Sequence, residues 1–168
     1  MCYIDYVVEE SPEIENVVLD LSCNGGGAID SAVYLLSWML GSCDVSVKNG
    51  VTMAQATTKV VADVNLDGLF DEKDNISDKN LYCLISPISF SCGNYVPAVL
   101  KASNKVTMLG QKSSGGTCLV GKATSADGSF FNISSSSQLT VVEDGVYKHL
   151  EDGVTPHYEL TDTFFRYK

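Results

Sequence analysis

Three consecutive glycines lie between two apolar segments, and they restrict the local fold more than any other feature of the chain. Residues 16–21 (NVVLDL) are apolar and β-branched, which is typical of a buried strand. Residues 28–40 carry a broad apolar face and precede Gly41, which predicts a helix with a glycine cap. The loop at 24–27 is therefore expected to expose backbone N–H groups at the positive end of a helix dipole.

A second strand and helix follow further along the chain. Residues 81–86 (LYCLIS) predict a strand, and residues 91–102 predict a helix. Pro97 is expected near the start of this helix, because deeper inside it would remove a backbone hydrogen bond. Residues 105–109 predict a third strand. Residues 117–148 contain turn residues between apolar runs, which predicts β-hairpins.

The order of these elements predicts an α/β domain with hairpins toward the C-terminus. The apolar residues of segment 2–13 recur at helix-like intervals. Residues 45–62 do not distinguish between a helix and a strand. A length of 168 residues suits one domain, since a chain of this size buries roughly 70 % of its unfolded surface. We expect residues 1–168 to be a single domain of a longer protein, because the chain begins inside a helix-like segment.

Composition excludes several classes of protein. The chain has 11 Lys and Arg against 21 Asp and Glu, a net charge of −10, so nucleic acid and anionic membrane surfaces are not expected partners. No apolar run approaches the roughly 20 residues that a membrane-spanning helix needs, so membrane insertion is not expected. The six cysteines form neither a C-x-x-C pair nor a cluster with zinc-ligand spacing, and they predict no disulfide framework.

The two strand-to-helix loops carry the candidate chemistry. The glycine loop could hold a phosphate or an oxyanion, but the Lys-Ser/Thr ending of a P-loop and a G-x-G-x-x-G pattern are both missing. A tight turn without a ligand is the alternative. Ser91 lies where the second helix begins, and a hydroxyl there could act as a nucleophile or simply as an N-cap. Ser89 is a second candidate for either role.

Four segments resemble one family, the tail-specific (C-terminal-processing) serine peptidases. Residues 18–27 (VLDLSCNGGG) resemble its D-L-x-x-N-x-G-G signature, and residues 89–94 (SFSCGN) resemble its nucleophile motif. Residues 110–116 (GQKSSGG) are similar to G-E-x-T-x-G-G/K, and residues 151–157 (EDGVTPH) to E-x-G-V-x-P-D. The four occur in family order. The resemblance implies a crotonase/Clp-protease-like spiral of β-β-α units.

The same resemblance implies a serine peptidase that hydrolyses polypeptides through an acyl-enzyme on Ser91. The backbone amides of Cys92 and Gly26, with Gly25 as the other donor, would then form the oxyanion hole. Glu151 matches the glutamate of the branch that resembles the tricorn protease core. These roles are what the resemblance implies for a catalytic subdomain.

The general base is the open question. One branch of the family uses a lysine in the glycine-rich segment, where this chain has Gly116, and Lys112 is displaced from that position. The other branch uses an upstream histidine, but His149 and His157 both come late in the chain. We expect His157 to be structural and His149 to lie on the surface. The base is therefore expected in an upstream segment or domain of the same protein.

Residues 63–74 (DVNLDGLFDEKD) form a calcium-loop-like insertion. Oxygen side chains fall at positions 1, 3, 5, 9 and 12 of the loop, with glycine at 6 and a carbonyl at 7. The predicted ligands are Asp63, Asn65, Asp67, the Leu69 carbonyl, Asp71 and Asp74. The aspartate at position 12 resembles dockerin-type loops. We expect structural calcium, the alternative being a solvated acidic turn.

Two other functions are compatible with the sequence. One is a non-catalytic descendant of the peptidase fold that binds peptides or serves as a scaffold. The other is a crotonase-like acyl-CoA enzyme, although no adenine-binding groove is recognisable in the sequence. The acidic composition and the calcium loop together suggest an exported, cell-surface or extracellular protein.

Overall fold

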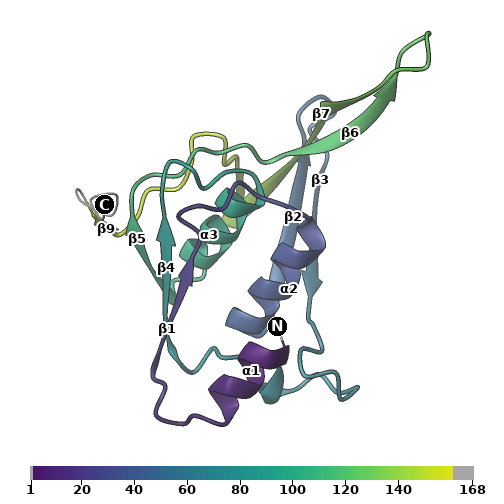
Figure 1. Ribbon diagram of the computed structural model, residues 1–168. Helices are drawn as coiled ribbons and strands as arrows, with labels where there is room; N and C mark the ends of the chain where they lie inside the picture. Colours follow the sequence, from purple (N-terminus) through teal and green to yellow (C-terminus); the bar gives the residue numbers. More distant parts are fainter. Residues whose placement is uncertain (1, 161–168) are drawn as a thin grey trace.

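Two β-sheets with helices between them build residues 2–160, the part of the chain that this computed structural model describes (Figure 1). The elements in chain order are α1 (Cys2–Glu9), β1 (Asn16–Asp20), α2 (Ile29–Leu40), β2 (Cys43–Asn49), β3 (Gln55–Val60), a 3-10 turn η1 (Glu72–Asp74), β4 (Asn80–Ile85), α3 (Cys92–Ala102), β5 (Val106–Gly110), β6 (Cys118–Thr124), β7 (Phe130–Glu143), β8 (Val146–Lys148) and β9 (Tyr158–Glu159).

The first sheet is parallel and has the order β1-β4-β5-β9. Asp20 at the end of β1 pairs with Leu84 near the end of β4, so the two strands finish side by side. The glycine loop and the turn before Ser91 therefore leave the same edge of the sheet. In open α/β sheets this carboxyl edge is where ligands bind.

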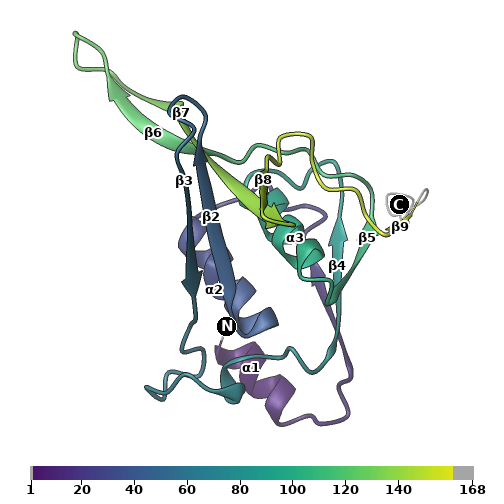
Figure 2. The same cartoon turned by 180° about the vertical axis from the view of Figure 1, so that it is seen from behind.

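The second sheet is antiparallel and has the order β3-β2-β7-β6, with β8 added beside β7. The ambiguous residues 45–62 belong to the β2–β3 hairpin. Strands β6 and β7 continue beyond the sheet as a two-stranded arm that projects from the molecule (Figure 2). The predicted hairpins of the C-terminal half are thus present.

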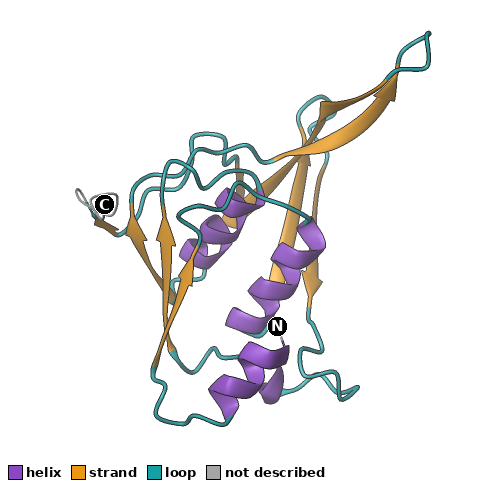
Figure 3. Ribbon diagram, in the orientation of Figure 1, coloured by secondary structure: helices purple, strands orange, loops and turns teal. Residues whose placement is uncertain are grey.

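Helices α2 and α3 lie between the sheets and supply much of the core (Figure 3). Leu36 and Met39 of α2, Tyr95 and Leu100 of α3, and Met108 of β5 are fully buried. Helix α1 is joined to α2 by a hydrogen bond of 2.6 Å from Trp38 Nε1 to the buried carboxylate of Asp5. None of the described helices combines the length and apolarity needed to cross a bilayer.

The α/β class predicted from the sequence is confirmed, and so is the cap of α2. Gly41 has a φ of +83° and its amide donates to the Ser37 carbonyl over 2.8 Å. The expectation for Pro97 is wrong, because this residue lies in the middle of α3 and not near its start. Pro97 is fully buried, so the packing of its ring in the core offsets the backbone hydrogen bond that it cannot make.

Candidate active site

The glycine loop and the turn before α3 are in direct contact. A Cβ atom on Gly26 would lie 2.6 Å from Ser91 Cβ and 3.1 Å from Ser91 Oγ. Gly26 also has a φ of +108°, which disfavours any other residue. The Phe90 amide donates to the Asn24 carbonyl over 3.1 Å and holds the two segments together. The structure therefore brings Ser91 and Gly26 side by side.

Ser91 has an unusual backbone conformation. Its φ of 57° and ψ of −123° lie in a region that non-glycine residues rarely occupy, at a cost of about 1–3 kcal/mol. Its hydroxyl makes no capping hydrogen bond to α3, and the residue is half-buried. The Ser91 amide donates to the Gly115 carbonyl over 2.9 Å. The turn is thus held by a distant segment, and the hydroxyl is not used as the N-cap.

The amides expected to form an oxyanion hole differ in what they already bind. Within residues 2–160 no acceptor is hydrogen-bonded to the backbone N–H of Cys92 or Gly25. The Gly26 amide, in contrast, donates to Asn24 Oδ1 over 2.8 Å. Cys92 and Gly25 therefore offer unpaired donors, whereas Gly26 becomes available only when the Asn24 side chain moves.

The Cys92 thiol, next to Ser91, is not an activated nucleophile. Burial raises the pKa of this thiol, so it stays protonated at neutral pH. Its Sγ donates to the Gly27 carbonyl over 3.1 Å. The Cys92 side chain thus adds a further hydrogen bond between α3 and the glycine loop.

Glu151 is anchored by the segment that also contacts Ser91. Its carboxylate accepts hydrogen bonds from the amides of Gly116 (3.2 Å) and Thr117 (2.9 Å), and from the Thr117 hydroxyl (3.0 Å). Burial alone would raise the pKa of Glu151, but these hydrogen bonds outweigh it and lower the pKa. Glu151 is therefore an ionised acceptor at neutral pH, able to orient a donor but unsuited to carrying a proton itself.

A side chain at position 116 would require the Phe90 ring to move. A Cβ on Gly116 would lie 2.2 Å from the Phe90 ring, and the φ of this residue is +79°. Lys112 is exposed on the same segment. Across residues 2–160 no basic side chain is hydrogen-bonded to the Ser91 hydroxyl. The Ser-Lys arrangement of the first branch is thus not assembled here.

The two histidines are engaged elsewhere. His157 Nδ1 accepts a hydrogen bond from the Met108 amide over 3.0 Å, and the His157 amide donates to the Met108 carbonyl over 2.9 Å. His157 therefore stabilises the edge of the parallel sheet through its hydrogen bonds to the backbone of β5. His149 is exposed, with its Nε2 atom 3.8 Å from a carboxylate oxygen of Asp152.

Three buried polar residues around the site were not identified from the sequence. Asn94 and Ser113 are hydrogen-bonded to each other, and Thr117 holds Glu151. They lie within or next to the short motifs, which was the one signal that could have singled them out. Ser89, a candidate nucleophile, is fully buried and donates to the Leu21 carbonyl over 2.7 Å, so its role is structural.

The acidic loop is closed by hydrogen bonds between its own residues. Asp63 Oδ2 accepts from the Gly68 amide over 2.9 Å. Asn65 Oδ1 accepts from the Asp67 amide over 3.0 Å, and Asp67 Oδ1 accepts from the Leu69 amide over 2.8 Å. The tight turn expected of residues 63–69 is therefore formed.

Asp74 closes the other end of this loop and is itself buried. Its carboxylate accepts hydrogen bonds from the amides of Val64 (2.6 Å), Asn65 (3.3 Å) and Asp71 (3.0 Å). Burial raises the pKa of Asp74, but these hydrogen bonds outweigh it and the pKa is lowered. In the described part of the chain, no group of three or more His, Cys, Asp or Glu side chains is arranged to hold a metal ion.

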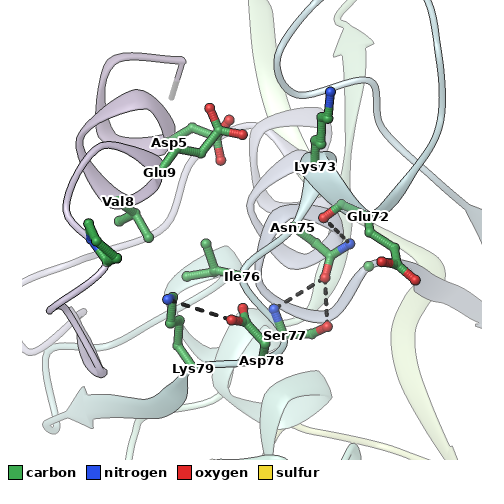
Figure 4. A pocket seen from close by; sticks show the side chains of 12 residues that line it. Asp5, Val8, Glu9, Glu72, Lys73, Asn75, Ile76, Ser77, Asp78 and Lys79 are labelled. Carbon is green, nitrogen blue, oxygen red and sulfur yellow. Dashed lines mark hydrogen bonds and ion pairs between the residues drawn. The ribbon is translucent and has the colours of Figure 1, made fainter.

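A separate cavity of about 730 Å³ lies between α1 and residues 72–79 (Figure 4). Its walls carry both signs of charge, for example Glu9 and Lys79, and Lys79 is paired with Asp78 at 3.5 Å. None of the predicted site residues lines this cavity. The candidate active site is thus distinct from it.

The sequence pattern of peptidase family S41 matches residues 6–160. The chain belongs to this family. The family resemblance of the four motifs is thereby confirmed. A protein of Chlamydia pneumoniae is 34 % identical over 84 residues, which are 49 % of this chain and 13 % of that protein.

Solved structures show the same S41 fold. The photosystem II D1 C-terminal processing protease superposes with a TM-score of 0.71 at 19 % identity, covering 94 % of this chain and 37 % of that one. Mature CPAF superposes with a TM-score of 0.69 at 17 % identity, covering 95 % of this chain and 41 % of that one. The chain thus spans less than half the length of these proteins.

Proposed function

We propose that this S41 chain carries the nucleophile and the oxyanion hole of a serine peptidase that cleaves polypeptides. The observation that supports this most is the contact between Gly26 and Ser91 beside the unpaired amide of Cys92. A reactive hydroxyl and main-chain donors are the two parts that acyl transfer requires. Both lie at the carboxyl edge of the parallel sheet, next to the positive end of α3.

In the proposed reaction Ser91 Oγ attacks the carbonyl carbon of a peptide bond and gives up its proton to a base. The carbonyl electron pair moves onto oxygen, where the Cys92 amide and a glycine-loop amide, that of Gly26 or Gly25, donate hydrogen bonds. Collapse of this intermediate expels the amine, which takes the proton back from the base. Water then hydrolyses the acyl-enzyme. Losing one such donor costs typically about 3 kcal/mol of transition-state stabilisation.

The base comes, in this proposal, from an upstream segment or domain of the same protein. Glu151 is suited to orient a histidine brought in from outside, because its carboxylate is ionised and fixed by the Gly116 and Thr117 amides. Lys112, His149 and His157 make no hydrogen bond to Ser91. The chain alone is therefore expected to react slowly or not at all.

A fluorophosphonate probe tests the nucleophile directly, since it phosphonylates an activated serine. In the full-length protein we expect labelling that is lost in Ser91→Ala. The matched control is Ser129→Ala, which alters an exposed serine of the β6–β7 arm and should label like the wild type. Equal labelling of the wild type and Ser91→Ala would refute the proposal.

A non-catalytic peptide-binding module is the second candidate, favoured by the missing contact between Ser91 and any base within residues 2–160. It predicts a full-length protein that binds unstructured peptides but is not labelled by the probe. Labelling at Ser91 separates the two candidates in a single experiment.

We also propose that residues 63–74 bind a structural calcium ion. The support is the fit of the turn, closed from Asp63 to Gly68, and the buried Asp63 Oδ1 atom, which has no hydrogen-bond partner in the described part of the chain. A cation there would satisfy that oxygen. Asn65, Asp67, the Leu69 carbonyl, Asp71 and Asp74 would supply the further oxygen ligands after side-chain rearrangement, because no three acidic side chains of the described residues are now arranged around one point. Calcium would then stabilise the folded state by mass action, and a melting temperature equal in calcium and in chelator would contradict the proposal.

A further inference from the structure

A buried polar bridge joins the helix that follows Ser91 to the loop that carries Glu151. Asn94, in the first turn of α3, is fully buried and its Nδ2 donates to the Leu150 carbonyl over 3.0 Å. Its Oδ1 accepts from the Ser113 hydroxyl over 2.6 Å. The Ser113 oxygen in turn accepts from the Val154 amide over 2.7 Å.

The hydrogen bonds of the bridge all point the same way along it, and every polar group in it has a partner. Each group donates to the next, from the Val154 amide through Ser113 and Asn94 to the Leu150 carbonyl. The Ser113 amide also donates to the Val154 carbonyl over 3.1 Å, which doubles the link between the two loops. Buried networks of this kind favour one arrangement strongly, because breaking any link leaves a desolvated polar group without a partner.

The bridge spans the three segments that form the site. Leu150 and Val154 flank Glu151 in the chain, so the position of their backbone determines the position of the Glu151 backbone. Ser113 begins the segment whose Gly115 carbonyl accepts from the Ser91 amide. Asn94 belongs to the helix whose first amide, that of Cys92, is the proposed oxyanion donor. No other pair of side chains in residues 2–160 is hydrogen-bonded to all three segments.

We propose that Asn94 and Ser113 are positioning residues that set the place of Glu151 relative to Ser91. Neither side chain contacts the reacting atoms. They act by fixing the loop at 150–154 against α3, so that the Gly116 and Thr117 amides meet the Glu151 carboxylate. The inference rests on the proposed function for its catalytic meaning, whereas the positioning itself can be measured without activity.

Amide hydrogen exchange of Gly116 and Thr117 in the full-length protein measures that positioning, because both amides donate to Glu151. In Asn94→Leu and in Ser113→Ala we expect these two amides to exchange at least about tenfold faster. Ser113→Thr, which keeps the hydroxyl, should retain protection. Ser103→Ala is the matched control, since it removes a hydrogen bond to the Leu100 carbonyl at the far end of the same helix.

The second measurement is the rate of fluorophosphonate labelling of Ser91 in the folded variants. We expect a fall of about tenfold in Ser113→Ala and Asn94→Leu, and no change in Ser103→Ala. If Asn94→Leu does not fold, the milder Ser113→Ala decides the outcome. Unchanged exchange at Gly116 and Thr117 would overturn the inference, and so would faster exchange with unchanged labelling. If the wild type is not labelled at all, the proposed function fails, and the exchange data alone decide the bridge.

Discussion

The nucleophile turn, residues 89–94, and the acidic loop, residues 63–74, are both polar loops, but they are held in opposite ways. The acidic loop is closed by its own side chains, as when Asp63 accepts from the Gly68 amide. The nucleophile turn is held by remote segments: the Ser91 amide donates to the Gly115 carbonyl, and the Phe90 amide to the Asn24 carbonyl. The hydrogen bonds that close the first connect residues close in the chain, whereas those that hold the second connect residues far apart in the chain.

This difference indicates which substitutions should change stability alone and which should also change the reactivity of Ser91. A change in the acidic loop should alter the stability of that loop and leave Ser91 unaffected. A change at a remote segment that contacts the nucleophile turn should alter Ser91 even when the fold survives. The following predictions test this division, beginning with the largest expected effect.

Gly26→Ala should have the largest effect on Ser91. Its methyl group would lie 2.6 Å from Ser91 Cβ and 2.9 Å from the Phe90 carbonyl oxygen, so the two loops must separate. We expect fluorophosphonate labelling to fall by about 100-fold or more, since the proposed oxyanion donors lose their alignment. The control is Gly121→Ala in β6, where an added Cβ meets nothing nearer than 3.6 Å. Labelling of Gly26→Ala at the wild-type rate would show that the contact is irrelevant.

Asp74→Ala should destabilise the acidic loop without lowering the reactivity of Ser91 toward the fluorophosphonate probe. Three backbone amides, those of Val64, Asn65 and Asp71, donate to this carboxylate, and Asp74→Ala removes all three hydrogen bonds. We expect the free energy of unfolding to fall by about 1–3 kcal/mol in urea titrations with chelator present. Labelling of the folded variant should stay near the wild-type rate, and a large loss of labelling would break the proposed division.

Gly68→Ala should have a smaller effect, and only on stability. The residue has a φ of +84°, but an added Cβ would meet nothing within 4 Å. The expected cost is therefore the backbone strain alone, about 1 kcal/mol, measured by the same urea titration. Comparison with Gly26→Ala separates the cost of a left-handed conformation from the cost of a steric clash. A Gly68→Ala variant as poorly labelled as Gly26→Ala would argue against the division.

Glu151→Gln should show the smallest effect on stability, visible in the pH dependence of the free energy of unfolding. The pKa of Glu151 is lower in the folded state than in the unfolded state, so the carboxylate stabilises the fold above its ordinary pKa. This contribution is lost as the pH falls through the lowered value. The free energies of unfolding of wild type and variant should therefore differ at pH 7 and converge once the pH falls below the lowered pKa of Glu151. Parallel curves across this range would mean that Glu151 is not held by the Gly116 and Thr117 amides.

Much of the architecture could be predicted because the signals are local. The apolar run at 16–21 and the periodic face of 28–40 depend only on neighbouring residues, and both elements form as expected. Pro97 was misplaced because its cost inside a helix is local, whereas the compensating burial of its ring is tertiary. The ambiguous 45–62 became a hairpin through its pairing with β7, which the segment itself does not encode.

The candidate site was only partly predictable, for the same reason. Ser91 and Gly26 carried signals in short motifs. Asn94, Ser113 and Thr117 lie within or next to the same motifs, but their roles were not recognised, because a buried polar side chain is identified by its partners and those lie 19 to 56 residues away in the chain. The contact between the Phe90 ring and Gly116 is likewise tertiary, because the two residues lie in different segments of the chain.

By itself the sequence determined the order of strands, loops and helices, the acidic turn and the family, since each depends on residue types at short, fixed spacings. Only the tertiary structure decided that Ser91 lies against Gly26, that Glu151 is ionised and fixed, and that the Phe90 ring occupies the space beside Gly116. Those outcomes depend on contacts between segments far apart in the chain. Such contacts are not encoded at short spacings, because the packing of one segment creates the surroundings of the next.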